Sequence, residues 1–350
     1  MRRCNLKPED RPRVGFLTAY VPEELFHAAG FTPVYVFHTE EEHSLARVHL
    51  PGFTCWVAGS ALDQALAGKL DDLAGMALAQ TCDTMQGLTD LWQRNVGHIP
   101  LFHFAMPTRL SGPAARVFLL AELEDLRQRV QALTGRALLD DDLRASIAVY
   151  NRTRAIVRDL YGRAVALDPR ESYGIVRDAF RQPKEVFAQE AGGRIQDATP
   201  TLPLSSAPPL FVVGPSLADP VLFDIIAEAG ARVVGDLLDL GERYFALDAA
   251  EDGDPLEVLV DRLLALVPTP TKHHSGRSRG AYLLSLAKAR GARGVVFARQ
   301  KFCDPHGFDY AHLVRALEGA GVPHLLVELE QASQVGQLRT RVQAFVEMLS

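Results

Sequence analysis

Three cysteines stand where apolar, strand-like runs of the sequence end. Cys82 and Cys303 each follow such a run and each precede an aspartate, in the sequences TCD and FCD. Cys55 follows the second expected strand, whereas Cys4 lies upstream of the first and is interpreted as incidental. Thiolates suit a soft metal centre. Cysteine-only ligation of an iron–sulfur cubane normally takes four thiolates, so three would leave one iron open, as catalytic zinc sites keep one position for water or substrate.

A structural interpretation of these cysteines stands beside the chemical one. Free cysteines are often buried as small hydrophobic residues, and no C-x-x-C run occurs here. The case for a shared site therefore depends on where the three cysteines lie relative to the ends of the strands. Ligands of open parallel sheets bind beyond the carboxyl ends of the strands. If two lobes pack with those ends facing, the three sulfur atoms meet in one cleft, two from the first lobe and one from the second.

Two neighbouring features could support chemistry at the same edge. His306 comes three residues after Cys303. It is a candidate proton donor, or a residue that contacts the metal ligands without binding the metal itself. The loop 272–280 carries Arg277 and Arg279 between glycines at the start of an expected helix. Such a loop can contact phosphate, and the alternative is an ordinary solvated loop.

The elements that would position these residues occur twice along the chain. Each half contains an apolar strand, a helix that begins at a proline, an Ala-Gly stop at Gly30 or Gly230, and a second strand. A third strand then leads into Cys82 or Cys303, and a helix and a fourth strand follow. The spacing differs between the copies by about twenty residues, which one insertion explains. Strands that alternate with helices predict parallel sheets covered on both faces, so we expect an α/β fold with two duplicated lobes of about four strands each.

The remaining sequence defines the expected domain boundaries. The first lobe occupies residues 1–110, and 111–190 are interpreted as helix almost throughout because apolar residues recur at helical spacing. The stretch 191–209 is rich in glycine and proline and is the expected linker. The second lobe then occupies 210–350, with a closing helix over 337–349.

Composition excludes several classes of protein. The chain has 350 residues, 38.4 kDa and a formal net charge of −6, so we expect no nucleic-acid partner. The longest uncharged run, 198–218, contains five prolines and could not span a membrane. The basic N-terminus lacks an apolar segment and a cleavage site, and we expect a cytoplasmic protein. Neither a Walker A pattern nor G-x-G-x-x-G occurs, so the chain itself is not expected to bind ATP or a dinucleotide.

Taken in order, these motifs resemble the 2-hydroxyacyl-CoA dehydratase / benzoyl-CoA reductase family. The resemblance extends from about residue 12 to residue 346 and rests on YVPEEL at 20–25, AAGFTP at 28–33, Cys55, TCD at 81–83, KFCD at 301–304, GVP at 321–323 and GQLRTRVQAF at 336–345.

The resemblance implies two Rossmann-like or flavodoxin-like lobes and one 4Fe-4S cluster per chain, held between the lobes by Cys55, Cys82 and Cys303 with one open iron position. It implies a dimer with a homologous or identical subunit and a separate ATP-dependent iron–sulfur activator that delivers low-potential electrons. The reaction would be radical dehydration or reduction of an acyl-CoA or aromatic-CoA thioester. Thr18 and Tyr20, just past the first strand, are candidates for a hydrogen bond to substrate or to an iron-bound water; they could equally be plain strand-end residues.

Three hypotheses remain open from the sequence. The favoured one is an enzyme subunit with an iron–sulfur cluster in a system of this kind. The second is an electron carrier or accessory iron–sulfur protein that binds no thioester of its own. The third is a zinc-binding or metal-free α/β protein that binds a ligand on the same scaffold.

Overall fold

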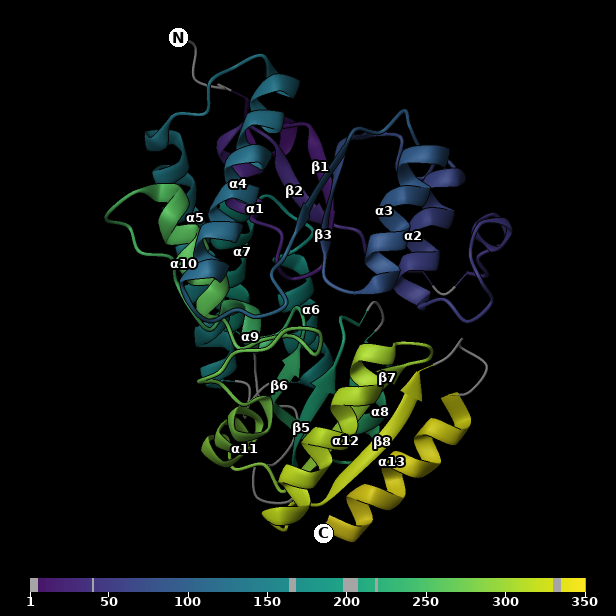
Figure 1. The fold of residues 1–350 in the computed structure, drawn as a ribbon. Helices are drawn as coiled ribbons and strands as arrows, with labels where there is room; N and C mark the ends of the chain where they lie inside the picture. The colour runs from purple at the N-terminus through teal and green to yellow at the C-terminus, as the bar shows by residue number, and fades with distance from the viewer. Residues whose placement is uncertain are drawn as a thin grey trace.

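The computed structural model describes residues 6–39, 41–163, 168–197, 207–217, 220–329 and 335–349. Cys4 lies outside these residues. The chain forms two α/β lobes, each built on its own parallel sheet, with a set of helices beside the first lobe (Figure 1). This confirms the expected fold class.

The first lobe contains a four-stranded parallel sheet in the order β2-β1-β3-β4. Apolar side chains line both faces of its inner strands, as a parallel sheet covered on both sides requires. Its strands are β1 (Arg13–Leu17), β2 (Thr32–Tyr35), β3 (Leu73–Gln80) and β4 (Leu101–Ala105). Its helices are α1 (Glu23–Ala28), α2 (Trp56–Leu66) and α3 (Asp83–Asn95), with short 3-10 turns η1 (Pro8–Asp10) and η2 (Ala46–Val48).

The second lobe repeats the first in strand number, direction and order, β6-β5-β7-β8. Its strands are β5 (Pro209–Gly214), β6 (Arg232–Leu238), β7 (Gly294–Gln300) and β8 (His324–Leu329). Its helices are α8 (Val221–Glu228), α11 (Arg279–Ala289), α12 (Asp304–Gly319) and the closing helix α13 (Val335–Leu349), which begins two residues before the expected start. The duplication expected from the sequence is therefore a duplication of sheet topology.

The two Ala-Gly stops end equivalent helices in the same way. Gly30 has φ 94° and Gly230 has φ 81°, the left-handed region that glycine enters without a steric penalty. In each copy the glycine N–H bonds to a carbonyl three residues back, and the next N–H bonds to a carbonyl five residues back. Both helices therefore close with the same glycine cap, and the chain turns into β2 or β6.

Four helices lie between the strands of the two lobes in the sequence. They are α4 (Pro113–Thr134), α5 (Asp140–Arg163), α6 (Pro169–Asp178) and α7 (Lys184–Asp197). The expected linker 191–209 begins inside α7, which continues to Asp197, and ends where β5 begins at Pro209. Residues 198–206 lie outside the described residues.

The insertion that makes the second copy longer than the first packs into the hydrophobic core of the first lobe. It forms α9 (Glu242–Phe245) and α10 (Pro255–Ala265), which follow β6 in the sequence. Their apolar side chains share one hydrophobic core with β1 and with α4 and α5, and Figure 1 shows α10 beside α5. A segment of the second half is thus built into the first. No helix within the described residues is long and apolar enough to cross a bilayer.

Candidate functional site

A cavity of about 90 Å³ lies where the carboxyl ends of both sheets meet. Its walls come from the residues that follow β1, β3, β5, β6 and β7. Six of the residues singled out from the sequence line it, namely Thr18, Tyr20, Cys55, Cys82, Cys303 and His306, whereas Arg277 and Arg279 do not. The rule that ligands of parallel sheets bind at this edge thus leads to one cavity between the lobes.

Each of the three cysteines occupies the N-cap of a helix. Cys55 begins α2, Cys82 begins α3 and Cys303 begins α12. The first N–H groups of a helix have no partner within the helix, and the helix dipole favours negative charge at this end. Backbone N–H groups of the first turn act to lower the pKa of each thiol. The three helices therefore present sulfur atoms to the cavity in surroundings that favour thiolate.

Two of the thiols are in direct contact across the boundary between the lobes. The Cys303 thiol donates a hydrogen bond to the sulfur of Cys55, which lowers the pKa of Cys55 to about 7 despite its burial. The same bond and burial raise the pKa of Cys303. Burial also raises the pKa of Cys82, against the bonds from the Met85 and Thr84 N–H groups. The Cys55–Cys303 contact therefore stabilises a thiolate shared between the two lobes.

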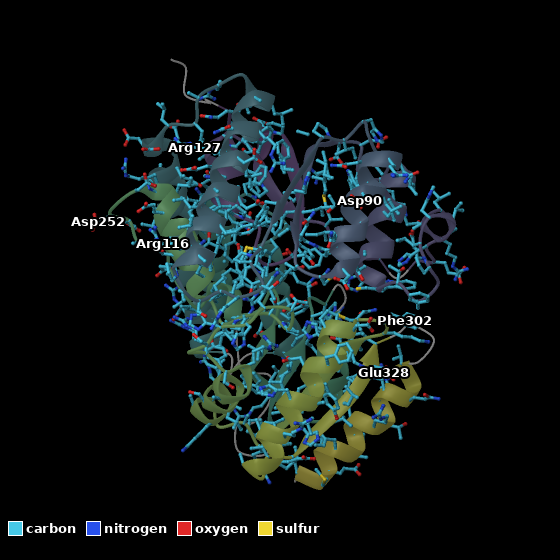
Figure 2. The ribbon with its side chains drawn as sticks, in the orientation of Figure 1. Asp90, Arg116, Arg127, Asp252, Phe302 and Glu328 are labelled. Atoms are coloured by element: carbon cyan, nitrogen blue, oxygen red, sulfur yellow. The ribbon has the colours of Figure 1, made fainter. Side chains whose placement is uncertain are left out.

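The backbone next to two of these residues adopts a conformation that non-glycine residues rarely enter. Thr18 has φ 75°, and Phe302, immediately before Cys303, has φ 62°. Figure 2 shows Phe302 on the side of the second lobe that faces the first. The Thr18 hydroxyl is buried and has no hydrogen-bond partner among the described residues. Buried hydroxyls are normally satisfied, so the Thr18 oxygen is a group that an occupant of the cavity could bind.

Tyr20 and His306 are held by contacts with the second half of the chain. The Tyr20 side chain is fully buried, and its hydroxyl accepts a hydrogen bond from the Thr269 N–H at 3.0 Å. His306 Nε2 lies 3.2 Å from Oδ2 of Asp239. Although burial acts to raise the pKa of Asp239, the neighbouring His306 lowers it overall. The two therefore form an ion pair when His306 is protonated.

The arginines of the loop 272–280 take different places. The Arg279 side chain is buried, bonds to Asp309 at 2.9 Å and donates to the Pro268 carbonyl. Its guanidinium thus fixes the start of α11 to α12, a role that neither alternative considered from the sequence, a phosphate contact or a solvated loop, describes. Arg277 is only partly buried.

Sequence reasoning missed two groups of the cavity wall. Asp239 directly follows β6, so the strand-end rule that found the cysteines would have found it too. The second group is a contact between Tyr35, at the end of β2, and Ser216, just after β5. Only the packing of one sheet against the other brings these two residues together, and neither sequence segment signals it.

A family model described as "2-hydroxyglutaryl-CoA dehydratase, D-component" matches residues 18–349. Lactoyl-CoA dehydratase subunit beta of Anaerotignum propionicum is 30% identical over 346 residues, which cover 96% of this chain and 91% of that protein. The (R)-phenyllactyl-CoA dehydratase beta subunit of Clostridium sporogenes is 27% identical, with 96% and 91% covered.

A third relative comes from a differently named system. One of the subunits of the benzoyl-CoA reductase of Thauera aromatica is 25% identical over 353 residues, which cover 97% of this chain and 91% of that protein. The likeness to each relative extends over nearly the full length of both chains, as does the match to the family model. The chain therefore belongs to the 2-hydroxyglutaryl-CoA dehydratase D-component family, in agreement with the resemblance found in its sequence.

Proposed function

We propose that this chain is the iron–sulfur subunit of a system that dehydrates or reduces a CoA thioester. Cys55, Cys82 and Cys303 each bind one iron of a 4Fe-4S cluster, and the fourth iron keeps an open position. A separate ATP-dependent activator supplies low-potential electrons, and the assembly includes a related or identical subunit. The relatives support this because their names describe CoA-thioester dehydratases and a reductase, and several are called subunits.

One observation carries the proposal: three thiols from three separate segments line a single cavity between the two sheets. Thiolates are the usual ligands of iron–sulfur clusters. Helix N-termini and backbone N–H groups at each sulfur favour thiolate and stabilise the negative charge of a bound cluster. The unsatisfied Thr18 hydroxyl gives an occupant one more contact. The donor set and its surroundings thus fit the cluster.

A single metal ion fits this donor set less well. Among the residues the structure describes, no three His, Cys, Asp or Glu side chains are arranged to hold one metal ion. A four-iron cluster makes a different demand, because each thiolate binds a different iron and the sulfur atoms need not surround one point. We therefore favour the cluster over a zinc centre on the chemistry of ligation.

The chain's own residues would have separate roles around the group. When bound, the cluster would supply Lewis-acid and one-electron chemistry at its open iron. The three helix N-termini orient the ligands, and the surrounding apolar core excludes water. Thr18 and Tyr20 present hydroxyl groups at the cavity, and His306 holds a proton at Nε2 against Asp239.

The size of the cavity favours a second candidate, an electron carrier whose thioester lies on another subunit. Pockets for small-molecule substrates usually enclose about 300–1,000 Å³. The cavity here encloses about 90 Å³ before any cluster is placed in it. An acyl group would need the walls to move apart. This subunit would then pass electrons to the related subunit that binds the substrate.

Anaerobic purification tests the cluster. The wild-type protein should be brown and contain about four irons per chain, as expected for one cubane. Cys55→Ser, Cys82→Ser and Cys303→Ser should each lose most of the iron, whereas Cys4→Ser is the matched control and should retain it. An iron-free wild-type protein that cannot be reconstituted would contradict the proposal.

Titration with CoA thioesters separates the two candidates. Acyl-CoA and aromatic-CoA compounds are added to the reduced protein while its EPR signal is recorded. A substrate-binding subunit should show a changed signal at saturating thioester. An unchanged signal for the isolated chain, together with a change in the assembly with its related subunit, identifies the electron carrier.

A further inference from the structure

A segment of the second half of the chain, at His273, pairs with residues 108–110 of the first lobe. The His273 N–H bonds to the Thr108 carbonyl at 2.8 Å, and the Leu110 N–H bonds to the His273 carbonyl at 2.7 Å. Arg109 and His273 thereby form a parallel bridge. This pairing fixes the start of the loop 272–280 against the segment that follows β4.

Lys272, the residue before His273, is bound near the strand end that leads toward Cys82. Gln80 pairs with Ala105, so the next residues, Thr81 and Met106, continue side by side. Neighbouring strands lie about 4.8 Å apart. The Lys272 Nζ donates to the Met106 carbonyl at 3.0 Å. The ammonium is therefore bound at the strand end opposite the turn that leads into Cys82.

Lys272 is a buried cation with no carboxylate partner. Its relative exposure is 8%, and no Asp or Glu of the described residues lies within ion-pair distance of it. The other buried lysine, Lys184, is paired with Glu23 at 2.9 Å. An ammonium has three N–H donors, and the Met106 carbonyl accepts from one of them. Burial lowers the pKa of Lys272 to about 8, and the charge of Cys82 in its thiolate form opposes this shift.

A buried charge without a counter-charge is costly, so such a residue points to an anion that belongs beside it. We propose that the Lys272 ammonium is the counter-charge of the anionic centre held by the three cysteines, and that it raises the reduction potential of that centre. The inference rests on the proposed function. It makes Lys272 a positioning residue that acts on the centre through its charge, not a group that touches substrate.

The sign of the effect follows from the charges. Three thiolates give the bound cluster a net negative charge, and one electron from a low-potential iron–sulfur donor makes it more negative. No bond forms or breaks in this step. A fixed positive charge nearby stabilises the reduced form more than the oxidised form, so removing the charge must make reduction harder.

Three substitutions at position 272 separate charge from structure. Lys272→Met removes both the charge and the hydrogen bond to Met106. Lys272→Gln removes the charge but retains an N–H donor, and Lys272→Arg retains both. Lys288→Met is the matched control because Lys288 is exposed on α11. Each holoprotein is titrated anaerobically with dithionite and mediators, and the reduced cluster is followed by EPR together with the iron content.

We expect the ratio of reduced to oxidised cluster at a set potential to fall about tenfold in Lys272→Met and Lys272→Gln. For a one-electron couple this corresponds to a midpoint about 59 mV more negative. Lys272→Arg should stay close to the wild-type midpoint, and Lys288→Met should match it. If the neutral variants lose the cluster, retention of the cluster by Lys272→Arg alone supports the counter-charge.

Two results would overturn this inference and leave the proposed function standing. One is a Lys272→Gln protein with its full iron content and the wild-type midpoint. The other is loss of the cluster from Lys272→Arg as well as from the neutral variants, because the role would then be steric. A wild-type protein that binds no cluster would instead refute the proposed function, and the inference with it.

Discussion

The hydroxyl oxygens of Tyr35 and Ser216 lie 2.9 Å apart, although 181 residues separate them in the sequence. Tyr35 ends β2 and Ser216 follows β5, so this buried hydrogen bond joins the two sheets at the wall of the cavity. A buried hydrogen bond contributes about 1 kcal/mol to stability, and an unpaired buried partner costs more. The contact therefore offers a direct measure of how the lobes are coupled.

A double-mutant cycle should reveal this coupling. Tyr35→Phe and Ser216→Ala should each lower the free energy of unfolding by about 1 kcal/mol. The double variant should lose less than the sum, because the second substitution removes a group that already lacks its partner. Urea unfolding of the metal-free protein measures all four proteins. Additivity within about 0.3 kcal/mol would show that the two hydroxyls do not interact.

The buried pair Glu23–Lys184 should be far more sensitive to substitution than an exposed pair. Nζ and Oε2 lie 2.9 Å apart, and both side chains are almost fully buried where α1 meets α7. Lys184→Met should lower the free energy of unfolding by about 3 kcal/mol because it removes the cation paired with the buried Glu23 carboxylate.

An exposed ion pair on α5 provides the control for that experiment. Asp159 and Arg163 are one turn apart, and both are more than half exposed. Asp159→Asn should change the free energy of unfolding by less than about 0.5 kcal/mol. Similar losses in Lys184→Met and Asp159→Asn would contradict the assignment of Glu23–Lys184 as a structural pair.

Asp236 should give part of the pH dependence of stability. Burial raises the pKa of Asp236 from 3.8 to about 6, although the Tyr161 hydroxyl donates to its carboxylate at 2.5 Å. The folded protein then binds this proton more tightly than the unfolded chain does. The contribution of Asp236 to stability is therefore full below pH 4 and falls as the pH rises to about 6.

Asp236→Asn isolates this contribution. Relative to the variant, the wild-type protein should lose on the order of 3 kcal/mol of unfolding free energy between pH 4 and pH 6. Urea unfolding at several pH values measures the difference. Asp252→Asn alters an exposed carboxylate at the edge of the molecule (Figure 2) and should track the wild-type curve. A constant difference between wild type and Asp236→Asn would show that the carboxyl titrates alike in both states.

Two glycines should respond in opposite directions to alanine. Gly230 caps α8 with φ 81°, and no atom lies within 4 Å of the position that a Cβ would take. Gly230→Ala should therefore destabilise the protein by about 1 kcal/mol through backbone strain alone. Gly174 lies inside α6 with similar space around it, and Gly174→Ala should stabilise by about 0.5–1 kcal/mol. Thermal unfolding compares the two, and equal effects would contradict the capping role.

Local patterns in the sequence were sufficient to predict the elements and the edge of the site. Apolar runs and Ala-Gly stops are read within a few residues, and the structure has the strands and caps they indicated, Gly30 and Gly230 included. Because parallel strands bring their carboxyl ends to one edge, cysteines far apart in the sequence could be assigned to one cleft. Their ligation of a metal remains a prediction.

Contacts between distant segments could not be predicted in this way. The sequence left a phosphate contact and a solvated loop open for Arg279, and neither pointed to its partner, Asp309, which lies on another helix. Lys272 lies in an ordinary loop, and the pairing of His273 with Arg109 holds this loop against the segment after β4, where Lys272 donates to the Met106 carbonyl. Side-chain partners of this kind depend on how the lobes pack, which no periodicity in the sequence encodes.

The insertion that forms α9 and α10 limits how the gene can be divided. Tyr244 and Phe245 pack on Phe180, and Leu256 and Leu259 belong to the same hydrophobic core as β1. A fragment ending before β5 would lack these side chains and would expose the apolar surface they cover. Expressing the two halves as independent proteins should therefore give an aggregating first half, even though the sequence looks like a tandem repeat.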